Sequence, residues 1–268
     1  MIRRPAVSGR FYPAEPAELL STVKSFLEAD QQHTKAIGII VPHAGYVYSG
    51  PVAGAVYSRI ELPSRNIVLC PNHTGFGTPL SVMQSGAWQT PLGEMQIDEQ
   101  LSGALMAADH YLQADVEAHR FEHAIEVQLP FMQHIGGSEV QFAPITVGIG
   151  NLQRLQALGL AIAQVVQSVD TNTLIIASSD MNHYESDEIT RVKDRKAIDQ
   201  ILAMNPEGLY EVVQREQISM CGYGPAVSML TAAKRLGATK AELVRYATSG
   251  EVSLDFDHVV GYAGVIVS

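Results

Sequence analysis

Residues 37–50 read IGIIVPHAGYVYSG, and this segment sets the architecture of the chain. Its β-branched run, residues 37–41, is short and continuous, and it is bounded by Pro42. Such a run is typical of a strand buried on both faces of a sheet. His43 follows just past the carboxyl end of this predicted strand.

Two other buried strands end in the same way. The run at 67–70 leads into PNHTG, which contains His73, and the run at 174–177 leads into SSDMNHY, which contains Asp180 and His183. In an open α/β sheet, ligands bind in the crevice outside the carboxyl ends of the strands, where side chains from several strands converge. The sequence therefore predicts a functional site at these strand ends.

Helical patterns alternate with these strands. Apolar residues at helical spacing follow Pro16, a turn at 46–50 leads into a helix of small residues at 52–57, and a further helix spans 151–166. This alternation predicts an α/β fold, a single-domain sandwich over 1–268 whose central sheet is mixed, largely parallel and flanked by helices.

Two prolines fall inside predicted elements. A helix is expected over 122–135, interrupted or bent at Pro130, because an internal proline removes a hydrogen bond and clashes with the preceding turn. A strand is expected over 140–147, and Pro144 within it favours an edge position or a bulge.

Composition excludes several classes of function. The chain has 268 residues, of which 46% are hydrophobic and 17% charged, as in an ordinary globular protein. Lys and Arg number 18 against 28 Asp and Glu, which gives a net charge of −10 without any basic run. We therefore expect no nucleic-acid partner, which would need a basic surface. No apolar stretch approaches the roughly 18 residues of a membrane span, so we expect no membrane insertion.

The cysteines and the N-terminus predict a cytoplasmic protein. Cys70 and Cys221 cannot form a disulfide framework, which fits a reducing compartment. Arg3 and Arg4 are followed by Pro5 and not by an apolar segment, so we expect no export signal.

Histidines at the strand ends favour a metal site. A single histidine after a strand is usually a hydrogen-bonded structural residue, but three at equivalent strand ends would meet in one crevice. Neutral imidazole is the commonest transition-metal ligand, and two histidines with one anionic ligand are typical of non-haem iron enzymes. His43 and His73 are one βαβ unit apart, so we expect them on adjacent strands.

The anionic ligand has two candidates. Asp180 could bind metal or could orient a histidine ligand through a hydrogen bond. Cys221 lies between Met220 and Gly222, and its thiolate would be a strong soft ligand, although a buried inert cysteine is the alternative. Cys70 ends a buried strand and is expected to be inert.

Polar residues also occur inside the predicted helix at 122–135. His123 and Glu126 are three residues apart and share a helix face, so they could bind metal. A buried polar network that ties the helix to the sheet is the favoured interpretation.

Five segments in order, VPHAGYVYSG, PNHTG, EHAIEVQLPF, SSDMNHY and CGYGP, resemble the MEMO family. The chain is similar to its bacterial and archaeal branch, protein B of the AmmeMemoRadiSam system, from the RFYP arm to the VVGYAGVIV strand. The resemblance implies a fold like that of the class III extradiol dioxygenases. It implies a metal site at His43, His73 and Cys221, with His183 as the general acid/base and Asp180 as a further pocket residue. Cys221 replaces the glutamate ligand of those dioxygenases.

Three functions are compared. The first is a redox protein that uses non-haem iron or copper, with zinc suiting the same donors, and acts on an unknown small molecule or peptide. The second is a peptide- or protein-binding module that uses the same pocket without catalysis. The third is a cysteine hydrolase with Cys221, His183 and Asp180 as nucleophile, base and orienting acid. The resemblance adds an AMMECR-type protein and a radical SAM protein as expected partners.

Overall fold

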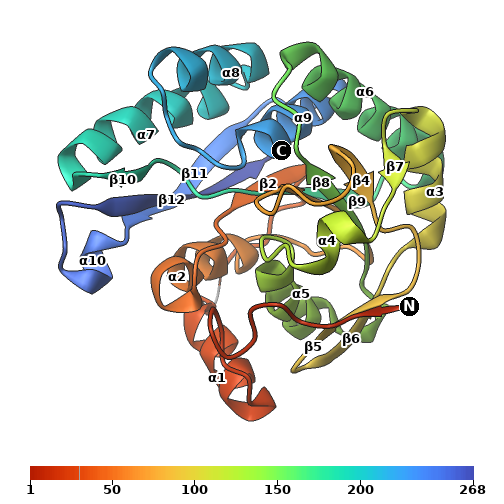
Figure 1. Ribbon diagram of the computed structural model, residues 1–268, viewed down its shortest axis with the longest axis horizontal. Coiled ribbons are helices and arrows are strands. Elements are labelled where there is room, and N and C mark those ends of the chain that lie inside the picture. Colours follow the sequence, from red (N-terminus) through yellow and green to blue (C-terminus); the bar gives the residue numbers. More distant parts are fainter. Residues whose placement is uncertain (30) are drawn as a thin grey trace.

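The computed structural model describes residues 1–29 and 31–268, which form a layered α/β structure (Figure 1). Within these residues a nine-stranded sheet lies between two groups of helices, and a three-stranded sheet lies beside one group. The large sheet contains β2 (Gly38–Val41), β3 (Arg65–Pro71), β4 (Leu80–Val82), β7 (Gln113–Ala114), β8 (Gln141–Val147), β9 (Thr173–Ser178), β10 (His183–Glu185), β11 (Ala241–Thr248) and β12 (Val259–Val267). The small sheet contains β1 (Ile2–Arg3), β5 (Ala87–Thr90) and β6 (Gly93–Gln96).

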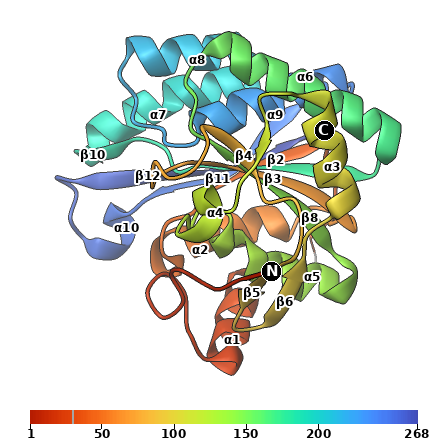
Figure 2. The ribbon, with the colours of Figure 1, turned by 45° about the vertical axis from the view of Figure 1, so that its right-hand side comes forward.

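Helices cover both faces of the large sheet. Those in the described ranges are α1 (Pro16–Phe26), α2 (Tyr46–Tyr57), α3 (Glu99–Ala108), α4 (Glu117–Arg120), η1 (Glu126–Gln128), α5 (Leu129–Gly136), η2 (Gly137–Glu139), α6 (Leu152–Val169), α7 (Asp187–Leu202), α8 (Pro206–Arg215), α9 (Tyr223–Arg235) and α10 (Gly250–Ser253). Helices α3, α6, α7, α8 and α9 pack on one face, and α1, α2, α5 and the small sheet pack on the other (Figure 2).

The centre of the large sheet is parallel. Its strand order is β2-β9-β3-β8, with all three pairings parallel. Successive side chains alternate between two apolar cores: Ile40 and Ile175 face one core, whereas Ile39 and Ile176 face the other. Strands β12 and β4 are antiparallel to β2 and β8, so the sheet is mixed. The predicted α/β sandwich is therefore confirmed.

The turn predicted at 46–50 is wrong, because α2 begins at Tyr46. The amides of Tyr48 and Ser49 already bond the Gly45 carbonyl, and the Ser49 hydroxyl donates to Ala44. The helix therefore starts three residues after His43 and includes Pro51.

The single bent helix predicted over 122–135 is also wrong. Residues 122–125 lie outside any helix, and η1 leads into α5 with Pro130 in the first turn. A proline in the first turn loses no hydrogen bond, because the first amides of a helix lack partners within it. Pro130 therefore begins the helix and does not bend it.

Pro144 does not mark an edge strand. Its strand, β8, lies inside the sheet between β3 and β4. Strand β4 pairs only with Ile145, Thr146 and Val147, so Pro144 lies outside that pairing. A proline inside the sheet is tolerated here because the neighbouring strand β4 is too short to pair with it.

Within the described part of the chain, no helix combines the length and apolar character that crossing a membrane would need.

Candidate metal centre

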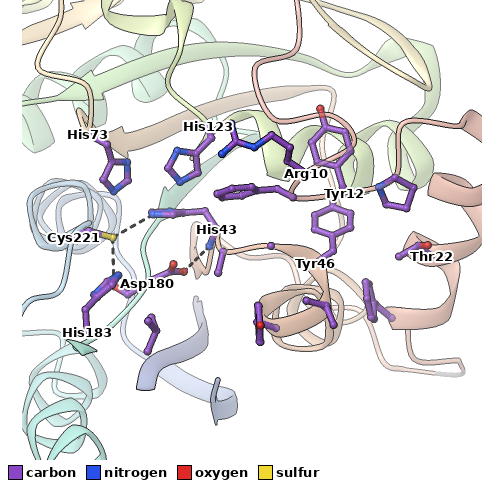
Figure 3. A pocket seen from close by; sticks show the side chains of 18 of the residues that line it. Arg10, Tyr12, Thr22, His43, Tyr46, His73, His123, Asp180, His183 and Cys221 are labelled. Carbon is purple, nitrogen blue, oxygen red and sulfur yellow. Dashed lines mark hydrogen bonds between the residues drawn. The ribbon is translucent and has the colours of Figure 1, made fainter. Parts of the chain in front are cut away.

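A cavity of about 1210 Å³ opens at the carboxyl ends of the central strands (Figure 3). All five predicted site residues, His43, His73, Asp180, His183 and Cys221, line it. The structure thus brings together side chains from three strand ends and from the segment before α9, although the role of each stays a prediction.

His43 and His73 do not follow adjacent strands, which corrects the expectation from their spacing. Strand β9 lies between β2 and β3, so the two histidines approach each other across its end. Their ring centroids are 5.2 Å apart. Asp180, which follows β9, lies between them in the sheet order.

A hydroxyl determines the tautomer of His43. Ser178 Oγ donates its one proton to the Ala124 carbonyl at 2.7 Å and accepts from Gln128 Nε2 at 3.0 Å. It must therefore accept the hydrogen bond from His43 Nδ1, also at 3.0 Å. Burial, reinforced by the neighbouring His73, lowers the pKa of His43 to about 3. His43 is thus a neutral imidazole whose Nε2 lone pair faces the cavity, where Cys221 Sγ lies 3.2 Å away as a hydrogen-bond partner.

A buried carboxylate orients His73. Glu122 accepts from the His73 backbone amide at 2.7 Å and from His73 Nδ1 at 2.9 Å. Burial opposes both charges, but the hydrogen bond and the pair attraction outweigh it: the pKa of His73 is raised, and that of Glu122 is lowered to about 2. A carboxylate that holds Nδ1 leaves Nε2 for a metal, which would displace a proton there.

His123 is a third imidazole in this group. One ring nitrogen each from His43, His73 and His123 lies within 4.8 Å of the other two. Burial and the neighbouring His43 lower the pKa of His123 to about 4. The sequence interpretation favoured a purely structural role for His123, whereas the structure places its ring in the cavity, because residues 122–125 are not helical.

Glu126 forms the polar network expected in this segment, but with a different partner. Its carboxylate accepts from the Arg3 guanidinium, the Ala6 and Val7 amides and the Tyr12 hydroxyl. Glu126 therefore ties the N-terminal arm to η1, whereas Ser178 of β9, bonded to Ala124 and Gln128, ties the same segment to the large sheet as expected.

Cys221 lies beside His43 in the same cavity. Its Sγ lies 3.2 Å from His43 Nε2 and 3.8 Å from the Asp180 carbonyl. Gly222 permits this approach, because a Cβ there would come within 2.4 Å of Ser179 Cβ. Burial and the charge of Asp180 raise the pKa of the Cys221 thiol, so a metal ion would be needed to make it a thiolate.

The three imidazoles form the group whose geometry can be compared with a tetrahedral ion, and Cys221 adds a sulfur beside His43. Bond lengths of about 2.3 Å to sulfur and 2.0–2.1 Å to nitrogen imply separations of about 3.5 Å for S···N and 3.4 Å for N···N. The contact between Cys221 Sγ and His43 Nε2, at 3.2 Å, is about 0.3 Å shorter than the first value. The imidazole nitrogens, all within 4.8 Å of one another, would close by at most about 1.4 Å.

Asp180 and His183 do not form the predicted hydrolase triad. Asp180 Oδ1 accepts from the backbone amide of His43 at 2.7 Å. His183 Nδ1 lies 2.9 Å from the Ser219 carbonyl, to which it donates. Among residues 1–29 and 31–268, no hydrogen bond joins the His183 ring to Asp180 or Cys221, so nucleophile, base and acid are not connected. Asp180 instead holds the chain at His43.

One protein family matches this sequence along nearly its whole length. The model of the Memo-like protein family matches residues 3–266. A MEMO1 family protein of Methanopyrus kandleri is 41% identical over 279 residues, covering 99% of both chains. A MEMO1 family protein of Methanosarcina barkeri is 42% identical over 267 residues, covering 99% of this chain and 100% of the relative.

The fold also has a solved counterpart. A crystal structure of an uncharacterized protein from Escherichia coli K12 superposes with a TM-score of 0.54 at 12% identity. The match covers 85% of this chain and 98% of the other. At this identity the likeness concerns the fold alone.

Proposed function

The chain belongs to the Memo family, and from this premise we propose that its strand-end cavity binds a redox-active iron or copper ion. The proposed ligands are His43 Nε2, His73 Nε2 and Cys221 Sγ. His123 offers a further nitrogen in the same cavity.

One observation carries the proposal: the two ligand histidines are anchored through Nδ1 and present Nε2. Ser178 holds His43 and Glu122 holds His73, so both tautomers are set before any ion arrives. An ion would replace the thiol proton between Cys221 and His43 and the proton on His73 Nε2, and both rings would already be oriented to receive it.

The donor types favour particular metals. Imidazole suits iron, copper and zinc, and thiolate favours the softer of these, whereas magnesium and calcium prefer oxygen. When bound, iron or copper would supply one-electron chemistry and an electrophilic centre. Around it, Asp180 would keep the His43 backbone in place, and His183, held through Nδ1, would accept or donate a proton at Nε2.

Metal analysis tests the proposal. Protein prepared anaerobically and reconstituted with Fe(II) or Cu(I) should hold near-stoichiometric metal by mass spectrometry, and the His43→Ala variant should lose it. His258→Ala is the matched control, because His258 is exposed and lies outside the cavity. Retention of metal in His43→Ala would overturn the site, and exclusive binding of zinc would overturn the redox function.

A further inference from the structure

We infer that the cavity accepts a small organic carboxylate, whose anionic group binds Arg10 and whose apolar body lies along the aromatic rim. The inference rests on the proposed function only in taking the histidine cluster as the reactive end of the cavity. It concerns the opposite wall, which the N-terminal arm forms (Figure 3).

Arg10 is an unpaired cation in an acidic protein. The chain carries a net charge of −10, yet no carboxylate in residues 1–29 and 31–268 lies within ion-pair distance of Arg10. Its side chain lines the cavity, and its guanidinium end is directed toward His123 (Figure 3). A planar guanidinium in this position matches a carboxylate through paired hydrogen bonds.

The arm holds Arg10 in a defined position. A tight turn forms at Gly9, whose φ is +76°, and the Gly9 amide donates to the Tyr12 carbonyl at 2.8 Å. The buried Glu126 carboxylate clamps the arm on both sides of this turn, through Val7 and Tyr12. Arg10 therefore projects from a preformed loop, which reduces the entropy cost of ligand binding.

The rest of the rim is apolar. Val47 is 60% exposed and Tyr184 is 74% exposed, and both line the cavity together with the ring of Phe11. Tyr184 adopts a φ of +63°, which is costly for an aromatic residue. These surfaces suit an apolar body. Asp180 is the acidic residue of the lining, and its Oδ1 accepts a hydrogen bond from the His43 amide, whereas Arg10 offers its guanidinium on the opposite wall.

The cavity volume favours a small molecule. Small-molecule sites typically enclose about 300–1,000 Å³, and this cavity, at about 1210 Å³, is somewhat larger than that range. Arg10 and the histidine cluster share one cavity, so one compact ligand can reach both.

Binding of matched probes tests the inference. Calorimetry on the metal-reconstituted protein would compare 3-phenylpropionate with 3-phenylpropionamide, which lacks the charge, and with acetate, which lacks the apolar body. We expect 3-phenylpropionate to bind about tenfold more tightly than either. Arg10→Met should remove the preference for the acid over the amide, whereas Arg4→Met should keep it. Arg4 is another exposed arginine of the same arm, and it does not line the cavity.

Equal binding of acid and amide to the wild type would overturn the inference. An acid preference that survives in Arg10→Met would overturn it as well, since the anion would then bind elsewhere. Acetate binding as tightly as 3-phenylpropionate would exclude the apolar contact.

The same titrations on His43→Ala separate this inference from the proposed function. An Arg10-dependent acid preference in a protein that binds no metal would support the inference while the metal function failed. Metal binding without an Arg10-dependent preference for the acid would support the metal function while this inference failed.

Discussion

Ser178 is the residue on which the geometry of His43 depends. Its hydroxyl has one proton and two lone pairs, and all three are used, by Ala124, Gln128 and His43. A residue without a hydroxyl would leave Nδ1 of His43 without an acceptor and would let the ring rotate or change tautomer.

We therefore predict that Ser178→Ala weakens metal binding by about 10–100-fold, as is usual when a group that orients a ligand is removed. A competition titration against a chelator of known affinity measures the effect. Ser168→Ala is the control, because Ser168 also donates to a carbonyl but lies in α6, away from the cavity. Unchanged affinity in Ser178→Ala would show that His43 does not need this acceptor.

Glu122 gives the site a pH dependence. Its folded pKa of about 2 lies below the ordinary 4.5, so it contributes stability that is present above pH 4.5 and is lost as the pH falls toward 2. The pKa of His73 is raised from 6.5, so its contribution is present below pH 6.5 and is lost as the pH rises through its folded value. The pair is therefore most stabilising between pH 4.5 and 6.5.

In metal-free protein, Glu122→Gln should lower the free energy of unfolding by on the order of 2–3 kcal/mol at about pH 5.5, and by less at about pH 3. Urea unfolding at the two pH values measures the difference. Glu117→Gln is the control, because the Glu117 side chain is 62% exposed and pairs with exposed Arg120. A loss of equal size at both pH values would contradict the assignment.

At the scale of elements, the N-terminal arm and η1 depend on each other. Glu126 is fully buried, and its carboxylate is the shared acceptor for Arg3, Tyr12 and two backbone amides of the arm. An amide at this position would direct two hydrogens toward groups that are themselves donors. The buried Arg3 would also lose its counter-ion.

Glu126→Gln should therefore destabilise the protein by about 3–5 kcal/mol, the usual cost of breaking a buried ion pair. Hydrogen exchange at the Ala6 and Val7 amides should accelerate more than exchange in β9, since the arm detaches first. Glu139→Gln, at an exposed glutamate, should change neither quantity. Exchange that accelerates equally in the arm and the sheet would indicate general unfolding and would contradict a specific clamp.

At the scale of the whole molecule, the proposed metal site links distant segments. Its ligands follow β2 and β3 and precede α9, so a bound ion would connect both sequence halves across one cavity. An ion that binds only the folded state stabilises it by about 2.7 kcal/mol when its free concentration is 100 times the Kd.

The melting temperature should therefore rise when Fe(II) or Zn(II) is added to chelator-treated wild type, and it should stay constant in His43→Ala. Differential scanning calorimetry measures both. The His258→Ala variant should respond like the wild type. An equal rise in His43→Ala would place the stabilising ion outside this cavity.

Local patterns determined the central strands and the residues that follow them. A β-branched run buried on both faces needs no distant information, and Pro42 and the polar segments after residues 70 and 177 mark where each strand ends. The similarity of motifs along the whole chain added the family and the prediction that Cys221 is a metal ligand. The α/β class and the strand-end histidines follow from patterns a few residues long.

Only the tertiary structure decided which strands are neighbours and which polar groups meet. The insertion of β9 between β2 and β3, and the interior position of β8 despite Pro144, depend on pairing between segments far apart in the chain. His123 enters the cavity because Glu122 and Glu126 bond partners 49 to 123 residues away, which overrides the helical pattern around them. Periodicity records which face of an element is buried, but it does not record the partner that buries it.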